Sequence, residues 1–320
     1  MKVLFHNNQL DLRGTTVSVS DYARYNQEIL GNESIICYDA TTRPGGYEGT
    51  DPGVRERLEK SFKVIGHQGP DDVKRIIDQE KIDFAYFQRG GWHEFLPDNC
   101  KTGVHAVFQK REVHGNVWAW ISEWLSDVMS PSNNPDPWVP YPIHLPAPNK
   151  NYREEWNIRP NQFIFGRHGG METFDLNFVK QQIYHILNTR DDFVFVFLYT
   201  QKWIDHPNVR FINPVQDLQT KSNMINTWDA MIHGRSQGES FGAAVAEALF
   251  LNKPVLSWEG GTDQHHAKVL ENSGLLYTEQ TLWEKMNNIR ELAKKEDWSQ
   301  RVAQFKPEVV MDRFDKVFLR

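Results

Sequence analysis

The stretch GRSQGESFGAAVAEALFLNKPVLSW, residues 234–258, follows an apolar run that ends near Ile232. A polar loop containing glycine comes first, and we expect a helix to begin near Ser240 or Phe241. The order of strand, loop, helix and strand is typical of parallel α/β folds, in which ligands bind where the carboxyl end of a strand meets the next helix. The stretch therefore predicts a fold class and the position of a site.

The start of this helix is a candidate anion site. Free backbone N–H groups and the helix dipole favour negative charge there. The small residues Gly242, Ala243 and Ala244 would let a phosphate approach closely, so a diphosphate would fit. An ordinary helix that begins with Ser240 as its N-cap is the alternative.

Glu239 and Glu247 stand eight positions apart. If both are helical, about 12 Å along the axis separates them. This is more than the ~5–9.5 Å between two carboxylates that act on one glycosidic bond, so the spacing argues against an acid/base pair. Glu247 lies at the flank of the expected buried stripe and needs hydrogen-bond donors there, which ribose hydroxyls would supply. Glu239, in the loop, would meet another part of the same ligand.

At these residues the sequence resembles the retaining nucleotide-sugar glycosyltransferases of family 4, which have the GT-B fold of two Rossmann-like domains. The resemblance rests on the Glu-x7-Glu motif, here ESFGAAVAE, followed by ALFLNKPVLSW. It implies that Glu239 contacts the donor sugar and acts in catalysis. It also implies that Glu247 contacts the ribose of the nucleotide, and that the backbone of residues 240–243 faces the diphosphate.

A second match is FIFGRHGGMETFDLNFV, residues 163–179. A strand, an arginine, glycines and a helix again make an anion-site arrangement, in which Arg167 can bind two phosphate oxygens. A surface salt bridge of Arg167 is the alternative. The resemblance implies a catalytic role for Arg167 in neutralising the leaving diphosphate, with donor-binding glycines at Gly166, Gly169 and Gly170. The family has a lysine five residues later, where Glu172 stands, so the second positive charge must come from elsewhere: His168, Lys202, Arg235 or a metal ion.

Two features of the first half also resemble the family. Gly14, within Arg13-Gly14-Thr15-Thr16, resembles the amino-terminal glycine loop that approaches the donor, and a flexible turn is the alternative. His105 resembles a histidine that reaches the donor sugar from a strand end, and a core histidine with satisfied hydrogen bonds is the alternative.

Other segments bear on specificity. WAWISEWLSDVM could be an aromatic acceptor platform, although the spacing of Trp120 and Trp124 favours a packed helix face. The loop from Asn213 to Asp217, which includes the donor-binding candidate Pro214, is expected to select the base. In the family, the loop that corresponds to EGGTDQHH shapes the pocket for the donor sugar. Its adjacent histidines are poorly placed to share a metal ion.

Length and composition limit the remaining possibilities. The 320 residues suit two domains, and the net charge of −6 gives no basic surface for nucleic acid. Seven prolines in residues 131–148 indicate a crossover. We therefore expect an acceptor-side domain at 1–148, a nucleotide-sugar domain at 149–290, and C-terminal helices at 291–320 that pack back on the first domain. No long apolar run is present, and the expected location is the cytoplasm, free or at a membrane surface.

The sequence thus predicts an α/β protein of GT-B fold, with parallel sheets facing across a cleft. The resemblance implies transfer of a sugar from a UDP- or GDP-sugar to a carbohydrate or glycoconjugate acceptor with retention of configuration. No cofactor or metal ion is expected. A nucleotide-sugar epimerase on the same fold and a catalytically silent binding subunit remain as alternatives.

Overall fold

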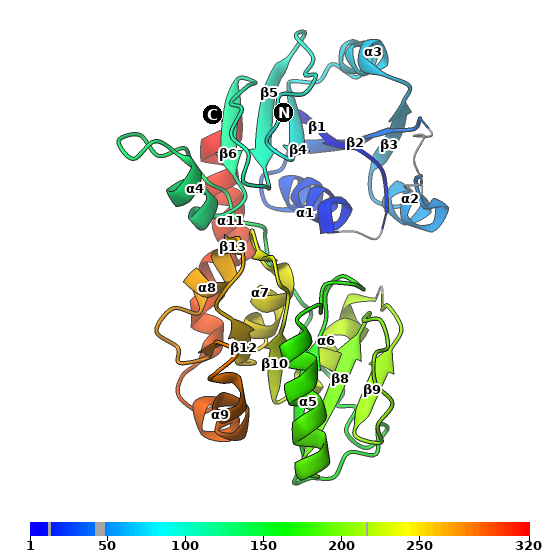
Figure 1. Cartoon of the computed structure of the whole chain (residues 1–320). Coiled ribbons are helices and arrows are strands. Elements are labelled where there is room, and N and C mark those ends of the chain that lie inside the picture. The colour runs from blue at the N-terminus through cyan, green and yellow to red at the C-terminus, as the bar shows by residue number, and fades with distance from the viewer. Residues whose placement is uncertain (12–13, 42–48, 216) are drawn as a thin grey trace. The chain divides into compact units, whose positions relative to one another are not determined.

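The computed structural model describes residues 1–11, 14–41, 49–215 and 217–320. It divides the chain into two compact units, each built on a parallel six-stranded sheet (Figure 1). Unit 1 comprises Met1–Pro142 and Phe305–Arg320, and unit 2 comprises Ile143–Gln304. None of the described helices is long and apolar enough to cross a membrane.

In unit 1 the strand order is β3-β2-β1-β4-β5-β6. The strands are β1 (Lys2–Asn7), β2 (Glu33–Asp39), β3 (Lys63–His67), β4 (Phe84–Arg89), β5 (Lys101–Ala106) and β6 (Val117–Trp120). The helical segments are α1 (Gly14–Glu28), α2 (Pro52–Glu59), α3 (Pro70–Glu80), α4 (Glu123–Met129), α11 (Pro307–Phe314) and the π-helical turn η2 (Asp315–Leu319).

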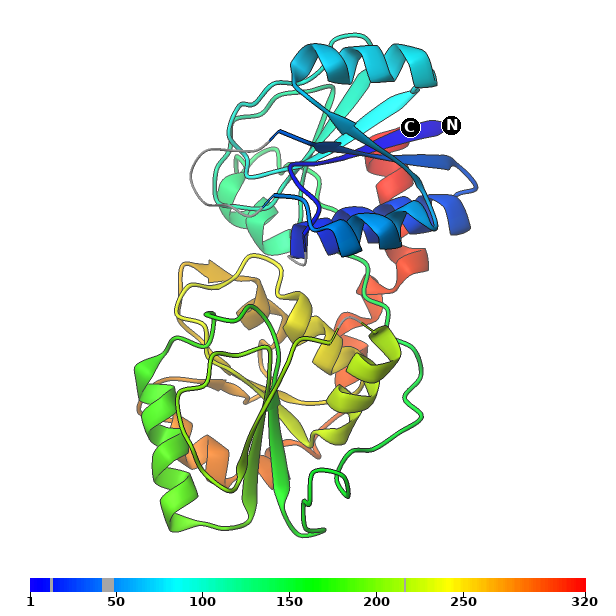
Figure 2. The same cartoon turned by 90° about the vertical axis from the view of Figure 1, so that its right-hand side faces the viewer.

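Helices cover both faces of this sheet (Figure 2). On one face, Val73, Ile76 and Ile77 of α3 pack in a buried cluster with strand residues such as Leu4. On the other face, α1 and the C-terminal helix α11 contribute aromatic rings. The Phe314 ring stacks on that of Tyr22, with centroids 5.3 Å apart. The last residues of the chain therefore complete the core of unit 1.

In unit 2 the strand order is β14-β12-β10-β7-β8-β9. These strands are β7 (Phe163–Arg167), β8 (Phe193–Leu198), β9 (Val209–Ile212), β10 (Ala230–His233), β12 (Val255–Trp258) and β14 (Leu276–Tyr277), and a separate small parallel pair is formed by β11 (Gly238–Glu239) and β13 (Asp263–Gln264). The helices are α5 (Asn177–Thr189), α6 (Leu218–Thr227), α7 (Ala243–Phe250), α8 (His265–Val269), α9 (Leu282–Asn287), α10 (Ile289–Leu292) and the 3-10 segment η1 (Trp298–Phe305).

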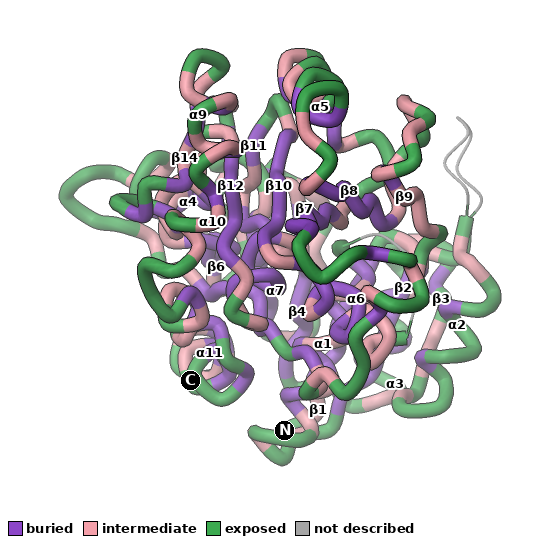
Figure 3. The backbone as a smooth tube through the Cα atoms, turned by 90° about the horizontal axis from the view of Figure 1, so that it is seen from below, coloured by how far each residue is buried: buried purple, intermediate pink, exposed green. Residues whose placement is uncertain are grey.

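The central strands of unit 2 are buried along their length (Figure 3). All six residues of β8, FVFVFL, are apolar and buried, as a parallel strand covered on both faces requires. Because every strand pair in this sheet is parallel, the carboxyl ends of the strands all lie at one edge, which we call the carboxyl edge.

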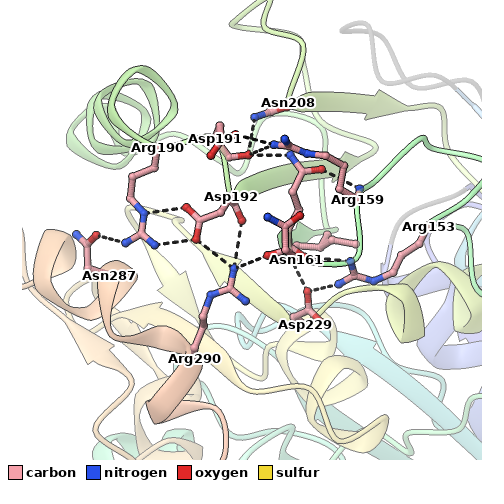
Figure 4. Close-up of polar contacts among 12 residues, drawn as sticks. Arg153, Arg159, Asn161, Arg190, Asp191, Asp192, Asn208, Asp229, Asn287 and Arg290 are labelled. Carbon is pink, nitrogen blue, oxygen red and sulfur yellow. Dashed lines mark hydrogen bonds and ion pairs between the residues drawn. The ribbon is translucent and has the colours of Figure 1, made fainter.

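The opposite, amino edge of the same sheet is held by arginine–aspartate pairs (Figure 4). Asp192, directly before β8, accepts hydrogen bonds from Arg190 at 2.7 Å and from Arg290 of α10 at 3.2 Å. Arg153 binds Asp229, whose carboxylate also accepts from the backbone N–H of Ile164 at 2.7 Å. The charged side chains at this edge are paired with one another, in keeping with a structural role.

The segment 117–129 differs from the sequence interpretation. Val117–Trp120 forms strand β6, and the helix begins only at Glu123, with Ser122 as its N-cap. Trp120 is fully buried and its indole N–H donates to Asp136. Trp120 and Trp124 therefore do not share a helix face. The i,i+4 spacing misled because the strand end and the helix start fall within four residues.

Candidate functional site

Helix α7 begins nine residues after Gly234, within the stretch 234–258. Gly242, with φ of +81°, is its N-cap, and Ala243 is the first helical residue, so Ser240 is not the cap. No side chain caps this helix. The positive end of its dipole therefore has no capping side chain in the described residues, although the ring of His168 contacts the backbone of Ala244 in the first turn.

Arg167 ends strand β7, and only 3% of it is exposed. Its guanidinium donates to the hydroxyls of Thr173 and Thr200, both at 2.6 Å, and to the carbonyl of Gly170 at 2.9 Å. The carbonyl of Tyr199 lies 3.4 Å away. Tyr199 has φ of +48°, an uncommon conformation for a residue with a side chain, at the end of β8.

The acceptors around Arg167 are thus all neutral. No carboxylate within the described parts of the chain forms an ion pair with it, although the charges of Glu239 and Asp175 act on it from farther away. Burial lowers the pKa of Arg167 to about 10, an effect to which the charge of Arg235 adds. The guanidinium remains cationic at neutral pH. A buried cation of this kind is suited to an anionic ligand.

Glu239 lies in β11, in the loop between β10 and α7. Its carboxylate accepts a hydrogen bond from Arg235 at 2.9 Å and lies 3.3 Å from Nε2 of His233, at the end of β10. Burial would raise the pKa of Glu239, but the contact with His233 and the nearby positive charges outweigh it, so the pKa is lowered. Glu239 is therefore a carboxylate at neutral pH.

His266 and His233 fix the backbone and side chain of Glu239. The backbone N–H of Glu239 donates to Nδ1 of His266 at 3.2 Å, so Nε2 carries the proton that His266 donates to the carbonyl of Trp258 at 2.8 Å. His266 is thus neutral, and burial lowers its pKa to about 4. On the other ring, Nδ1 of His233 lies 2.9 Å from the hydroxyl of Ser257.

Glu247 lies on α7 and is 8% exposed. Its carboxylate accepts from Lys221 of α6 at 2.5 Å and lies 3.3 Å from Nε2 of His168. Burial would raise its pKa, but the charge of Lys221 outweighs this and lowers it. Burial lowers the pKa of His168, the residue after Arg167, to about 4. Among the residues that the structure describes, Glu239 and Glu247 thus have separate partners.

The predicted glycines have different roles. A Cβ on Gly166 would lie 1.7 Å from the ring of Trp228, so this glycine makes room for core packing rather than for a donor. Gly169 has φ of +144°, and Gly170 supplies a carbonyl to Arg167. Pro214 lies in the exposed loop after β9, and Gln216 of the same loop is outside the described residues.

Phe241 is buried and its carbonyl accepts from Nδ1 of His265 at 2.6 Å. His265 and His266 therefore face different partners, and the described residues contain no cluster of three or more side chains that could hold a metal ion. Sequence reasoning missed Lys221, His233 and His266 as partners of the two glutamates. The one available signal for His233 was its place at the end of an apolar strand.

Glu172 is exposed and lines a cavity of about 410 Å³ beside the carboxyl ends of β7 and β8. Thr200, which binds Arg167, and Trp203 also line it. Lys202 pairs with the exposed Asp205 at 3.1 Å. Lys202 also lines the cavity.

The structure places His105 and Gly14 in unit 1. His105 is fully buried in β5, with Nδ1 2.6 Å from the Tyr86 hydroxyl and Nε2 2.9 Å from the Val139 carbonyl. Both ring nitrogens are thus occupied, as expected of a core histidine, and burial lowers its pKa to about 4. Gly14 is the exposed first residue of α1, and Arg13 lies outside the described residues.

No protein-family model matches the sequence, and no curated protein matches it. Solved structures match nearly the whole chain. A glycosyltransferase from Rickettsia africae ESF-5 has 14% identity and a TM-score of 0.69, covering 99% of this chain and 98% of that one. HepE from Anabaena, in complex with UDP, has 11% identity and a TM-score of 0.71, covering 99% of each chain.

A putative UDP-N-acetylglucosamine 2-epimerase from Listeria monocytogenes has 11% identity and a TM-score of 0.62, covering 98% of this chain and 94% of that one. At such identities the likeness shows the fold alone. The two parallel six-stranded sheets match those of GT-B glycosyltransferase structures, which confirms the predicted fold class.

The low pKa values of His168 and His266 predict a pH-dependent stability. Both are neutral in the fold down to about pH 4, whereas in the unfolded chain they protonate near pH 6.5. Unfolding between these values takes up about two protons from this pair, so the free energy of unfolding falls as the pH is lowered. We expect His266→Asn to reduce the dependence of the free energy of unfolding on pH by the equivalent of about one proton. Urea titrations at pH 5, 6 and 7 measure this slope. The exposed His185→Asn is the control, and equal slopes in all three proteins would contradict the assignment.

Proposed function

We propose that the chain is a retaining glycosyltransferase of the family 4 type, which takes its sugar from a nucleoside diphosphate sugar bound at the carboxyl edge of unit 2. The observation that carries the proposal is the buried charge of Arg167, which has neutral acceptors around it and no carboxylate partner in the described residues. A diphosphate would balance this charge and also use the uncapped start of α7.

Each side chain of the site has a role in this proposal. Arg167 and the backbone at Gly242 and Ala243 hold the diphosphate. Glu247 accepts hydrogen bonds from the ribose hydroxyls, with its carboxylate kept ionised by Lys221. Glu239 accepts hydrogen bonds from the donor sugar. The separate partners of the two glutamates suit contacts with two ends of one ligand.

In the transfer step, the bond between the anomeric carbon and the diphosphate oxygen breaks, and a bond to the acceptor oxygen forms on the same face of the sugar. The acceptor proton passes to the departing phosphate oxygen. Negative charge that develops on the diphosphate is stabilised by Arg167 and by the α7 N–H groups, which are already oriented before the reaction.

Arg235 is the best placed of the candidate second cations. It follows β10, it donates to Glu239 at 2.9 Å, and its charge is felt at Arg167. Lys202 instead pairs with an exposed aspartate, and His168 is neutral, with a pKa of about 4. Arg235 therefore substitutes for the lysine that the family has at the position of Glu172.

Epimerisation of a nucleotide sugar is the second candidate function. His233 and Glu239, 3.3 Å apart, form a pair of acid/base groups in the same loop region, and a putative epimerase is among the similar structures. Incubation with UDP-N-acetylglucosamine and no acceptor, followed by NMR of the sugar, distinguishes the two. An epimerised sugar would favour this alternative over transfer.

Titration of UDP-, GDP- and ADP-sugars by calorimetry and thermal unfolding tests the proposal directly. We expect at least one to bind. A ligand at one hundred times its dissociation constant should raise the free energy of unfolding by about 2.7 kcal/mol. Failure of every nucleotide sugar to bind would overturn the proposed function.

The two glutamates should respond differently to substitution. We expect Glu247→Ala to weaken nucleotide binding by about ten- to a hundredfold, because ribose hydroxyls lose a charged acceptor. Glu239→Ala should lower kcat more than it raises the dissociation constant of the donor. Calorimetry and donor turnover measure the two effects, with the exposed Glu291→Ala of α10 as control. Small, equal effects of both changes would contradict these roles.

Arg235→Gln should weaken binding of the nucleoside diphosphate about tenfold or more and leave the nucleoside almost unaffected, because the lost contact is to phosphate. Calorimetry with UDP, UMP and uridine, or the guanosine series if GDP binds instead, measures this. Arg159→Gln, at the amino edge, is the matched control. An equal loss for diphosphate and nucleoside would assign Arg235 a merely structural role in holding Glu239.

A further inference from the structure

Unit 1 presents two exposed aromatic rings at the carboxyl edge of its sheet. Trp92 follows β4 and is 49% exposed, and Phe108 follows β5 and is 47% exposed. The two strands are parallel neighbours, and the rings meet edge to face with centroids 6.2 Å apart. This is the edge at which ligands of open parallel sheets bind.

Hydrogen bonds join the two loops that carry these rings. The N–H of Glu112 donates to the carbonyl of Gly91 at 3.0 Å, and the N–H of His93 donates to the Glu112 carboxylate at 2.8 Å. Gly91 has φ of +108°, and a Cβ there would lie 2.0 Å from the Lys110 carbonyl oxygen. The loops therefore approach closely enough to require glycine, which fixes the positions of the rings.

The close approach of the Trp92 ring to the backbone also requires glycine at position 90. A Cβ on Gly90 would lie 2.0 Å from the Trp92 ring and 3.3 Å from the Phe108 ring. Trp92 therefore lies against bare backbone beside Phe108. Half of the residue surface of Trp92 is open to solvent.

Charged side chains border the aromatic pair. Lys110 and Glu112, on the same loop as Phe108, form an ion pair of 2.9 Å and are 43% and 42% exposed. They offer a donor and an acceptor next to apolar ring faces. The same loops also expose Phe95 and Val113. Lys110 and Glu112 lie between Phe108 and Val113 along the chain.

We propose that Trp92 and Phe108 form an aromatic platform for a pyranose ring of the acceptor, in which one ring stacks on the C–H face of the sugar and the other, tilted by 64°, contacts its edge, which makes the acceptor a carbohydrate. The proposal rests on the proposed function for its place in the reaction. A pyranose presents polarised C–H groups on one face, which suit the negative face of an aromatic ring, and its hydroxyls suit Lys110 and Glu112. A protein partner would need about 800 Å² of surface, more than two aromatic side chains supply.

Saturation-transfer NMR on the full chain tests the platform with three probes: the methyl pyranosides of α-glucose, β-glucose and α-mannose at millimolar concentration. We expect transfer to ring C–H protons of at least one probe. Trp92→Ala and Phe108→Ala should each weaken binding about three- to tenfold, and Trp92→Phe should retain most of it. Tyr184→Ala, which removes an exposed aromatic of α5, is the matched control and should change nothing.

UDP or GDP titration of the same proteins separates the two proposals. Urea unfolding curves of both alanine variants that match the native curve show that unit 1, which carries the platform, remains folded. Absence of transfer to every probe in the native chain, or equal transfer in native protein and Trp92→Ala, would overturn the platform. Loss of nucleotide binding by the native chain with glycoside transfer intact would overturn the proposed function and leave the platform supported.

Discussion

The charge of Arg167 is buried without a carboxylate partner in the described residues, and the site in unit 2 is arranged around it. Threonine hydroxyls and backbone carbonyls orient the guanidinium but leave its charge in place. Burial of such a group costs free energy, as its lowered pKa indicates. Little water lies around a buried charge to screen it, which strengthens its attraction to an anion.

The carboxylates of Glu239 and Glu247 are kept ionised by different neighbouring residues. Lys221 and His168 flank Glu247, whereas Arg235 and His233 flank Glu239. His266 adds a neutral acceptor for the backbone of Glu239, because its other nitrogen is committed to Trp258. Each carboxylate is therefore paired with one basic side chain, Glu247 with Lys221 and Glu239 with Arg235.

Much of this arrangement follows from local sequence. The apolar runs and intervening polar loops predict the strands, and the Glu-x7-Glu stretch predicts the loop before α7 and the helix itself. The partners of the glutamates could not be predicted in this way. Lys221 reaches Glu247 from α6, 26 residues away, and such contacts depend on how the helices pack. The spacing of Trp120 and Trp124 misled for a related reason, because periodicity does not show where a strand gives way to a helix.

Two predicted residues illustrate the same limit. A glycine before Arg167 fits a phosphate loop in sequence, yet Gly166 is required by the Trp228 ring that packs on β7. His105 has the residue type of an acid/base group, yet a tyrosine hydroxyl and a carbonyl from distant segments use both its nitrogens. The residue type indicates possible chemistry, but burial and long-range partners decide whether that chemistry is available.

The return of the chain to unit 1 at Phe305 bears on how the protein is made. Synthesis proceeds from the amino terminus, so all of unit 2 leaves the ribosome before α11 does. Until then the sheet of unit 1 lacks Phe314, which stacks on Tyr22, and one aromatic face of its core is uncovered. Unit 2 is continuous in sequence and has no such dependence. The core of unit 1 is therefore complete only with residues that follow unit 2 in the chain.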